Sequence, residues 1–293
     1  MKVYTGGVPS DDRTTTIQDS FVKLAVPPEI LSEADLADYR KSVTEFLKKR
    51  SFGAFPENSP LFDSSMVFRT LDRAEYGSDI YSFVSEEGWR LKVDLRWRND
   101  RSQKKPLMIV LRNSNENRWE SEEFIGDLDN RWSIAYLEVR GVGESGWDPN
   151  LQWHVRRASA WLGRTLASMQ VYDLTRCIEF CRTLNGVIAD SIGIAARDDM
   201  GVVALYAALL DGNCKTIILR NPPPTQDVAS SPDGRGAAIE ILNCLRITDV
   251  YQLPALLSPA EIIFVGDIPE SYKWSDEILK KTGKRPLRTI NNL

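Results

Sequence analysis

The sequence contains a single histidine, His154, among 293 residues. Histidine is the side chain that most often moves protons in enzymes working near neutral pH, and it is the commonest metal ligand. One copy would have to perform every such role in this chain. This scarcity argues against a histidine-rich metal site and limits any histidine-dependent catalysis to one residue.

Cysteine is also scarce, and its spacing is not that of a zinc site. The four cysteines form no C-x-x-C pair and have no accompanying histidines, whereas structural zinc sites combine such ligands. We therefore expect no bound metal. Cys177 and Cys181 lie four residues apart in a helical stretch, which is typical of small apolar residues on a buried helix face.

The chain lacks an excess of positive charge and any long apolar run. It has 37 Lys and Arg against 41 Asp and Glu, a formal net charge of −4, so it lacks the basic surface that neutralises nucleic-acid phosphates. No run of about 18 apolar residues occurs, so we expect no membrane span. The first residues lack the apolar core of a signal peptide, while export of a longer parent protein stays open.

The composition is that of a folded protein, with 42% hydrophobic and 27% charged residues, close to the average of soluble globular domains. Residues 1–30 are polar and contain turn-forming pairs such as Gly6-Gly7 and Pro27-Pro28, so we expect an arm or linker there. Regular patterns begin after it, and we expect residues 31–293 to form a single domain.

Strand and helix patterns alternate over most of the chain. Residues 80–84 and 91–97 predict an antiparallel hairpin around the turn at Glu87-Gly88. Later apolar runs are short and rich in β-branched residues, as in strands buried on both faces of a parallel sheet. The pattern predicts an α/β fold: a doubly wound, mostly parallel sheet with an N-terminal antiparallel hairpin and helices on both faces. The predicted parallel strands are 107–111, 133–139, 192–196, 216–220, 261–265 and 287–290, and the predicted helices are 32–50, 155–184, 201–210, 235–245 and 271–282. A break of the stretch 155–184 into two helices, at Gly163 or within 169–171, stays open.

Ligands of such sheets bind beyond the carboxyl ends of the strands, so the residues that follow each strand are candidates for a site. After the strand at 192–196 come Arg197, Asp198, Asp199, Met200 and Gly201, and then a helix of small residues. A strand, a tight turn and such a helix form the context of the nucleophile elbow, G-x-S-x-G. Alignment on Gly201 puts Asp199 at the nucleophile position, Met200 after it and Arg197 at the first glycine.

Other strand ends supply further candidates. Asp267 follows the strand at 261–265, the place where hydrolases of this kind carry the triad acid. Asn113, in the loop after 107–111, is a candidate binding residue, although that loop has no glycine to mark an oxyanion site. The segment RGVGESGW (140–147) lacks the spacing of the dinucleotide fingerprint G-x-G-x-x-G, so we expect neither NAD nor another cofactor.

The histidine of a catalytic triad should follow the last strand of this fold. The chain ends at Asn291-Asn292-Leu293 without one, and His154 precedes the elbow in chain order. We expect His154 near the start of a helix, either as an ordinary polar residue or as one that reaches the cleft. Without a base, an acyl or aspartyl ester would lack an activator for the attacking water.

Three segments carry a family resemblance: RGVGESGW (140–147), WHVRRASAWLGRTLASMQVYDLTRCIEF (153–180) and IGIAARDDMGVVALYAALLD (192–211). They resemble the acetyl xylan esterase and cephalosporin-C deacetylase-like α/β-hydrolases, and the likeness extends over residues 30–293. The resemblance implies the α/β-hydrolase fold. It also implies a serine, an aspartate and a histidine in the site, and here Asp199 stands at the first position, Asp267 at the second and no residue at the third. The triad is therefore expected to be degenerate.

Two functions are consistent with this pattern. In the first, the domain lacks its own Ser-His-Asp chemistry and serves as an accessory or carbohydrate-binding unit of a larger esterase, with another hydrolase domain or chain as its partner. In the second, Asp199 is the nucleophile of an atypical ester hydrolase. Asp198 or Glu144 would then be the base, because a neighbouring carboxylate raises the pKa of a carboxyl group toward neutrality.

The tryptophans suggest a third hypothesis, non-hydrolytic binding through aromatic faces. Trp147 and Trp153 belong to a loop region near the strand ends and are candidate ligand contacts, whereas Trp132 and Trp161 are expected in the core. The remaining candidate binding residues are His154, Arg197, Met200 and Asn113.

Overall fold

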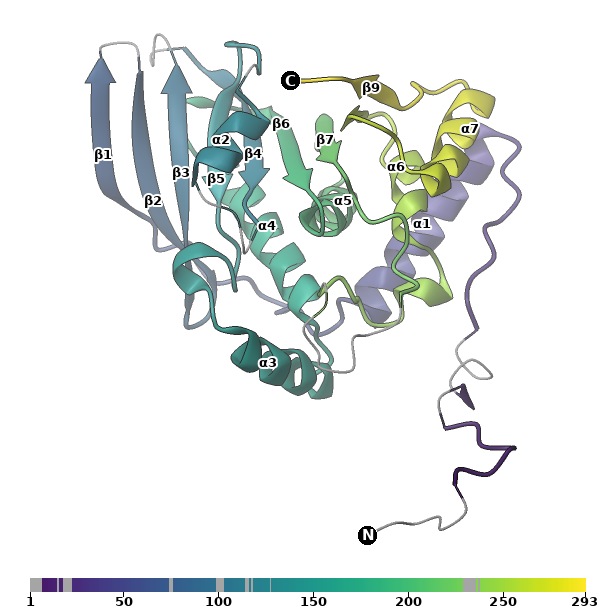
Figure 1. Cartoon of the computed structure of the whole chain (residues 1–293). Coiled ribbons are helices and arrows are strands. Elements are labelled where there is room, and N and C mark those ends of the chain that lie inside the picture. The colour runs from purple at the N-terminus through teal and green to yellow at the C-terminus, as the bar shows by residue number, and fades with distance from the viewer. Residues whose placement is uncertain are drawn as a thin grey trace.

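The computed structural model describes residues 7–14, 16–17, 23–73, 76–98, 103–113, 116, 118–126, 128–228, 236 and 238–293. Within these residues the strands form a nine-stranded sheet in the order β1-β2-β3-β5-β4-β6-β7-β8-β9 (Figure 1). The pairs from β1 to β5 along this order are antiparallel, and the pairs from β5 to β9 are parallel. The predicted fold class, a mostly parallel sheet with antiparallel N-terminal strands, is confirmed.

The strands are β1 (Ser65–Arg73), β2 (Tyr76–Glu86), β3 (Trp89–Arg98), β4 (Lys105–Leu111), β5 (Ser133–Leu137), β6 (Val187–Arg197), β7 (Thr216–Arg220), β8 (Glu261–Val265) and β9 (Arg288–Ile290). The α-helices are α1 (Glu33–Arg50), α2 (Arg118–Phe124), α3 (Pro149–Trp161), α4 (Leu166–Arg182), α5 (Met200–Asp211), α6 (Leu253–Leu256) and α7 (Lys273–Lys281).

Both faces of the parallel strands are covered, as β4 illustrates. Leu107 and Ile109 belong to the large apolar cluster that includes residues of α4 and α5. Met108 and Val110 point to the opposite face and pack in a second cluster with Phe124 at the end of α2. Because side chains alternate between the two faces of a strand, burial on both sides requires a continuous apolar run. This is the reason that residues 107–111 predict a central strand.

Helix α5 lies close to the sheet because its side chains are small or apolar and almost all are buried. Gly201 is needed in its first turn: a Cβ atom there would stand 3.0 Å from the Cβ of Pro222, in the segment after β7. This close approach fixes where the turn between β6 and α5 lies relative to the neighbouring strands.

A buried ion-pair network holds the loop that follows β5. The carboxylate of Asp173, in α4, is fully buried and accepts hydrogen bonds from the backbone and the guanidinium of Arg140 at 2.6–3.0 Å, and from Ser85 Oγ at 2.6 Å. Arg140 also donates to Glu86, which accepts from Arg164 as well. Burial lowers the pKa of Arg140, but the hydrogen bonds and charges of the two carboxylates outweigh it and raise that pKa overall. The network joins α4 to the ends of β2 and β5.

The helical stretch at 155–184 is interrupted at Gly163, which has φ of 73°, and forms α3 and α4. Other elements differ from the sequence prediction. Residues 238–243 are not helical, and only a short 3-10 turn, Cys244–Arg246, follows them. The carbonyl of Ile239 accepts a hydrogen bond from Gln226 Nε2 at 2.7 Å in place of a helical N–H, and Asn243 has φ of 63°, which interrupts a helix. Strand β1 was not predicted, because its exposed side chains show no alternation of apolar and polar residues.

The N-terminal residues that the structure describes run away from the sheet as an extended segment before α1 (Figure 1). The backbone N–H of Ala25 donates to the carbonyl of Leu245 at 2.8 Å. The division into an arm over 1–30 and one domain over 31–293 stays a prediction. Within the described part of the chain, no helix combines the length and the apolar character that a membrane crossing requires.

Replacement of Asp173 by Asn should lower the free energy of unfolding by about 3 to 5 kcal/mol, because it leaves the buried Arg140 guanidinium without its main counter-charge. The matched control is Glu144→Gln, which removes an exposed partner of Lys92 and should change stability by less than about 1 kcal/mol. Urea unfolding followed by circular dichroism measures both. Equal effects of the two substitutions would contradict the role assigned to the network.

Candidate functional site

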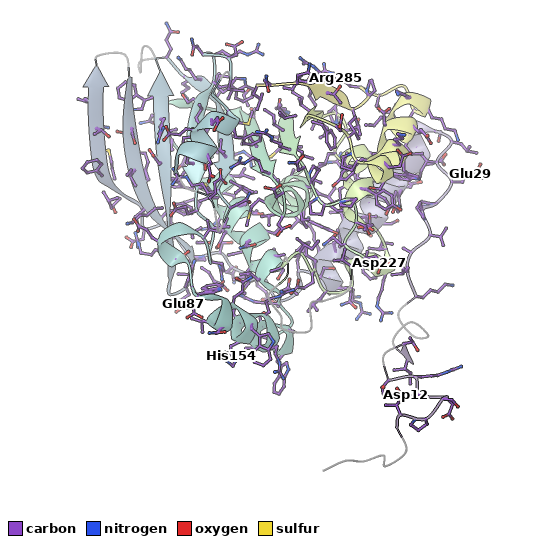
Figure 2. The ribbon with its side chains drawn as sticks, in the orientation of Figure 1. Asp12, Glu29, Glu87, His154, Asp227 and Arg285 are labelled. Atoms are coloured by element: carbon purple, nitrogen blue, oxygen red, sulfur yellow. The ribbon has the colours of Figure 1, made fainter. Side chains whose placement is uncertain are left out.

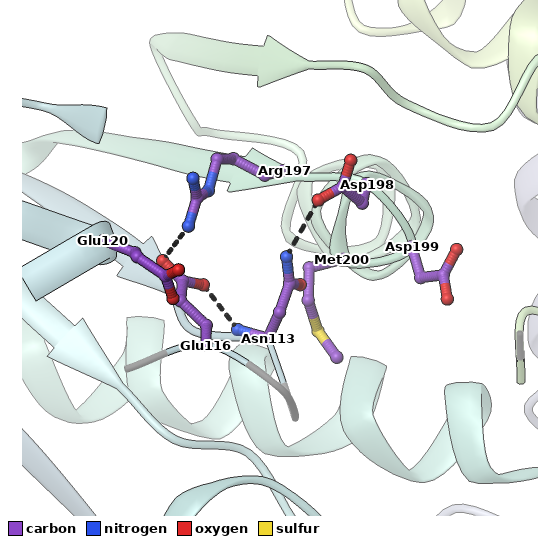
Figure 3. A pocket seen from close by; sticks show the side chains of 7 residues that line it. All are labelled: Asn113, Glu116, Glu120, Arg197, Asp198, Asp199 and Met200. Carbon is purple, nitrogen blue, oxygen red and sulfur yellow. Dashed lines mark hydrogen bonds and ion pairs between the residues drawn. The ribbon is translucent and has the colours of Figure 1, made fainter. Parts of the chain in front are cut away.

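A pocket of about 350 Å³ lies at the carboxyl ends of β4 and β6, beside the start of α5 (Figure 3). This is the edge of an open α/β sheet at which ligands bind. Five of its residues were predicted from the sequence, and the two glutamates were not. The lining residues are Asn113, Glu116, Glu120, Arg197, Asp198, Asp199 and Met200.

The turn between β6 and α5 has the sharp backbone of a nucleophile elbow, but its strained residue is Asp198. Asp198 has φ of 49°, whereas Asp199 has an ordinary helical φ of −57°. Hydrogen bonds hold the turn on both sides, from Asp198 N–H to the carbonyl of Arg220 at 2.9 Å and from Gly201 N–H to the carbonyl of Asp198 at 2.9 Å. The elbow nucleophile occupies such a strained turn position. The positive φ therefore falls one residue before the position that the alignment on Gly201 assigns to the nucleophile, and the assignment of Asp199 to that position stays a prediction.

The two aspartates leave the turn in different directions (Figure 3). Asp198 is exposed and accepts a hydrogen bond from Asn113 Nδ2 at 3.2 Å. Asp199 is half-buried on the other side of the turn. Burial raises the pKa of the Asp199 carboxyl, the charge of Asp198 raises it further, and Arg156 in α3 acts in the opposite direction.

One carboxylate missed in the sequence analysis, that of Glu116, accepts hydrogen bonds from donors in and around the loop after β4. Its side chain is only 3% exposed and accepts from the backbone N–H of Asn113 at 2.8 Å, from Ser121 Oγ at 2.7 Å and from the Arg197 guanidinium. In an α/β-hydrolase, a backbone N–H of this loop helps to form the oxyanion hole. Here the Asn113 N–H is already used within the chain. The role of Glu116 is recognisable only from its contact with Arg197 in the folded chain, so no local sequence signal pointed to Glu116.

Two buried polar atoms of the pocket residues have no hydrogen-bond partner among the described residues: Asn113 Oδ1, an acceptor, and Arg197 Nε, a donor. Buried polar groups are nearly always hydrogen-bonded, either to protein or to water or ligand. Both atoms are shielded from solvent, so their lack of a partner does not by itself assign them to a ligand; the side-chain oxygens of Asp198 and Asp199 are acceptors that the pocket lining offers.

The other predicted acids do not line this pocket. Asp267 is exposed after β8, and Glu144 is exposed and pairs with Lys92 at 2.6 Å. The structure thus brings Asp198 and Asp199 to the pocket but leaves Glu144 outside its lining. The catalytic roles suggested for these acids stay predictions.

His154 is exposed on α3 and points away from the body of the molecule (Figure 2). Its ring meets Trp153 edge-on, with the centroids 4.9 Å apart. The one histidine of the chain is not among the residues that line the pocket.

The predicted aromatic contacts are also outside the pocket lining. Trp147 packs over Gly141, and the guanidinium of Arg157 covers a face of Trp153 at 4.4 Å. Trp132 packs against the core as expected. The expectation for Trp161 was wrong: it is 91% exposed at the end of α3, because that helix turns only its other side toward the domain.

Hydrogen bonds of Arg156 hold α3 beside the turn between β6 and α5. The guanidinium of Arg156 donates to both carboxylate oxygens of Glu240, at 2.8 and 2.9 Å, and to the carbonyl of Gly236 at 2.8 Å. Such a bidentate pair is geometrically specific as well as strong. It ties α3 to the segment that precedes α6 and brings a positive charge toward Asp199.

The raised pKa of Asp199 predicts a pH-dependent effect of Asp199→Asn. A carboxyl group whose pKa is higher in the folded protein than its ordinary value of 3.8 costs stability once the pH exceeds that raised pKa. The Asn variant should therefore be more stable than the wild type at pH 7, and the difference should vanish as the pH falls below about 4. Thermal unfolding between pH 3 and pH 8 measures this; a wild type that gains relative stability with rising pH would contradict the assigned direction.

Comparison with known proteins agrees with the fold. No family model matches the sequence, and no curated protein matches it. Solved structures do match. A candidate acetyl xylan esterase from Bacteroides fragilis superimposes with a TM-score of 0.79 at 13% identity, over 97% of this chain and 83% of that chain.

Two further matches are a glucuronoyl esterase from Solibacter usitatus and acetyl xylan esterase 1 from Thermoanaerobacterium sp. The first has a TM-score of 0.63 at 10% identity, over 92% of this chain and 88% of that one. The second has a TM-score of 0.56 at 11% identity, over 94% of this chain and 92% of that one. At such identities the likeness shows the fold alone. The chain therefore has the α/β-hydrolase fold.

Proposed function

We propose that this chain is a ligand-binding domain with an esterase-like α/β-hydrolase fold that does not use Ser-His-Asp chemistry. We propose further that it serves as an accessory, carbohydrate-binding unit of a larger esterase, beside another hydrolase domain or chain. The observation that carries the proposal is the carboxylate of Asp198 at the strained elbow position, where an esterase of this fold holds its serine.

A carboxylate at this position is poorly suited to ester hydrolysis. Attack by Asp198 on an ester carbonyl would form a mixed anhydride and expel the alcohol, and a water molecule would then have to be activated to release the acid. That water needs a base. The one histidine lies outward on α3 (Figure 2), and Glu144 is engaged by Lys92.

The charges around the pocket also oppose the reaction. The tetrahedral intermediate of acyl transfer carries a negative oxygen, which an oxyanion hole stabilises with preorganised donors. The Asn113 N–H, which could be one such donor, already binds the carboxylate of Glu116. The carboxylates of Asp198 and Asp199 stand at the same turn, and like charges would raise the energy of the intermediate.

A hydroxyl-rich ligand suits the groups that the pocket offers. The carboxylates of Asp198 and Asp199 line the pocket and are acceptors for hydroxyl protons. Several structurally similar proteins are esterases of xylan or of glucuronoyl groups, which supports a carbohydrate as the ligand proposed here.

The proposal predicts that the wild-type chain does not release p-nitrophenol from p-nitrophenyl acetate faster than an Asp198→Ala, Asp199→Ala double variant. Both proteins should match the buffer rate, because neither has an activated nucleophile. Wild-type turnover that either single substitution abolishes would overturn the proposal. That result would favour the second hypothesis, hydrolysis centred on Asp199 or Asp198.

Binding gives an independent prediction. Xylo-oligosaccharides titrated by calorimetry should bind the wild type, and Asp198→Asn should weaken binding at least about tenfold, since a hydrogen bond to a charged group is worth about 1.5 to 3 kcal/mol. The matched control is Asp267→Asn, which alters an exposed aspartate outside the pocket lining and should leave the affinity unchanged. Equal loss in both variants, or no binding by the wild type, would contradict the carbohydrate assignment.

A further inference from the structure

One edge of the sheet is unusually apolar for a free surface. All seven residues 65–71, in β1, are exposed, and four of them are large and hydrophobic. Met66, Val67, Phe68 and Leu71 expose 46%, 49%, 56% and 67% of their surfaces. Single exposed hydrophobic residues are ordinary, but a contiguous group of them marks an interaction surface.

The backbone of β1 is available as well. Along the order of the sheet, β1 is the first strand, and among the residues that the structure describes it pairs only with β2 (Figure 1). Its other side presents a row of N–H and C=O groups, which is a template for a further strand. Edge strands that remain single are usually interrupted by lysine or proline, and residues 65–71 contain neither.

Charge does not oppose the approach of an identical strand. The only charged residue between 65 and 71 is Arg69, and its guanidinium donates to the buried carboxylate of Asp79 at 2.7 and 3.2 Å. The pair neutralises the edge inside each copy. An identical strand also supplies the complementary backbone groups in the antiparallel direction.

From this edge we propose that two copies of the chain associate through β1, which pairs antiparallel with β1 of the partner subunit and joins the two sheets into one. The interface is isologous, so the same residues are buried in both copies. Exposed apolar side chains on both faces of the strand would then be shared between the two sheets.

The register follows from the side chains. In a two-fold antiparallel pair, one residue lies opposite its own copy. Arg69 in that place would set two guanidinium groups against each other, which is unfavourable for directly opposed like charges. Phe68, the middle of the stretch 65–71, would instead form a favourable aromatic pair. Met66 then lies opposite Thr70 of the partner subunit. The pairing of β1 with β2 is irregular between Met66 and Phe68. This irregularity limits the proposed pairing of the two β1 strands to a short ladder.

A cysteine at the two-fold position tests the register directly. Phe68→Cys should form an intermolecular disulfide under mild oxidation, because residues opposed in an antiparallel pair have Cα atoms about 4.5 to 5.5 Å apart. Thr70→Cys, equally exposed, is the matched control: its copy would lie four residues along the strand, about 13 Å away. The natural cysteines Cys177, Cys181, Cys214 and Cys244 are all buried and should not cross-link.

Sedimentation velocity at 1 to 100 µM measures the association itself. The wild type should sediment as a dimer, and Phe68→Glu should weaken the dimer at least about tenfold because it opposes two carboxylates at the centre. Circular dichroism of each variant confirms that it is folded. A wild-type monomer at all concentrations, a dimer unaffected by Phe68→Glu, or equal cross-linking of the two cysteine variants would each overturn the proposal.

Discussion

The buried carboxylate of Asp173 is the constraint that holds the loop after β5 and the end of β2 against α4. It lies in α4, yet the groups bound to it come from the loop after β5 and from the end of β2. A charge without water must be matched by donors that stay in place. Arg140 supplies most of them and is itself held by Glu86. The ion-pair network therefore holds the carboxyl ends of β2 and β5 in place. The chemistry of the loops at this edge of the sheet can then vary while the fold is kept.

The turn between β6 and α5 shows this separation of backbone and chemistry. Its geometry is that of a nucleophile elbow, with a positive φ at Asp198 and a glycine that lets α5 approach Pro222. A positive φ is more tolerable for aspartate than for most other residues that carry a side chain. The strained position of the turn is thus occupied by a carboxylate. The fold presents the side chain at position 198 to the pocket, whichever residue stands there.

Much of the architecture follows from local patterns, and much of the site does not. The apolar runs at 107–111 and 192–196 predict central strands because strands buried on both faces have no other composition available. The sequence did not reveal that the positive φ falls at Asp198, because Gly201 set the alignment while its close neighbour, Pro222, lies some twenty residues later. The contact of Glu116 with Arg197 joins two segments that are far apart in the sequence, so no periodic pattern in the sequence predicts it. The exposure of Trp161 likewise depends on which side of α3 meets the domain.

Glu116 matters for the functional interpretation because it changes how well the pocket can stabilise negative charge on a substrate. An oxyanion hole is useful only if its donors are free when negative charge develops on the substrate. In this chain a resident carboxylate already receives the Asn113 N–H, the Ser121 hydroxyl and the Arg197 guanidinium. The donors are therefore satisfied before any ligand arrives, and the groups left over are mainly acceptors. A pocket of this kind attracts proton donors such as hydroxyl groups and disfavours anionic intermediates, so the contact that completes the loop after β4 supports the proposal of a binding site.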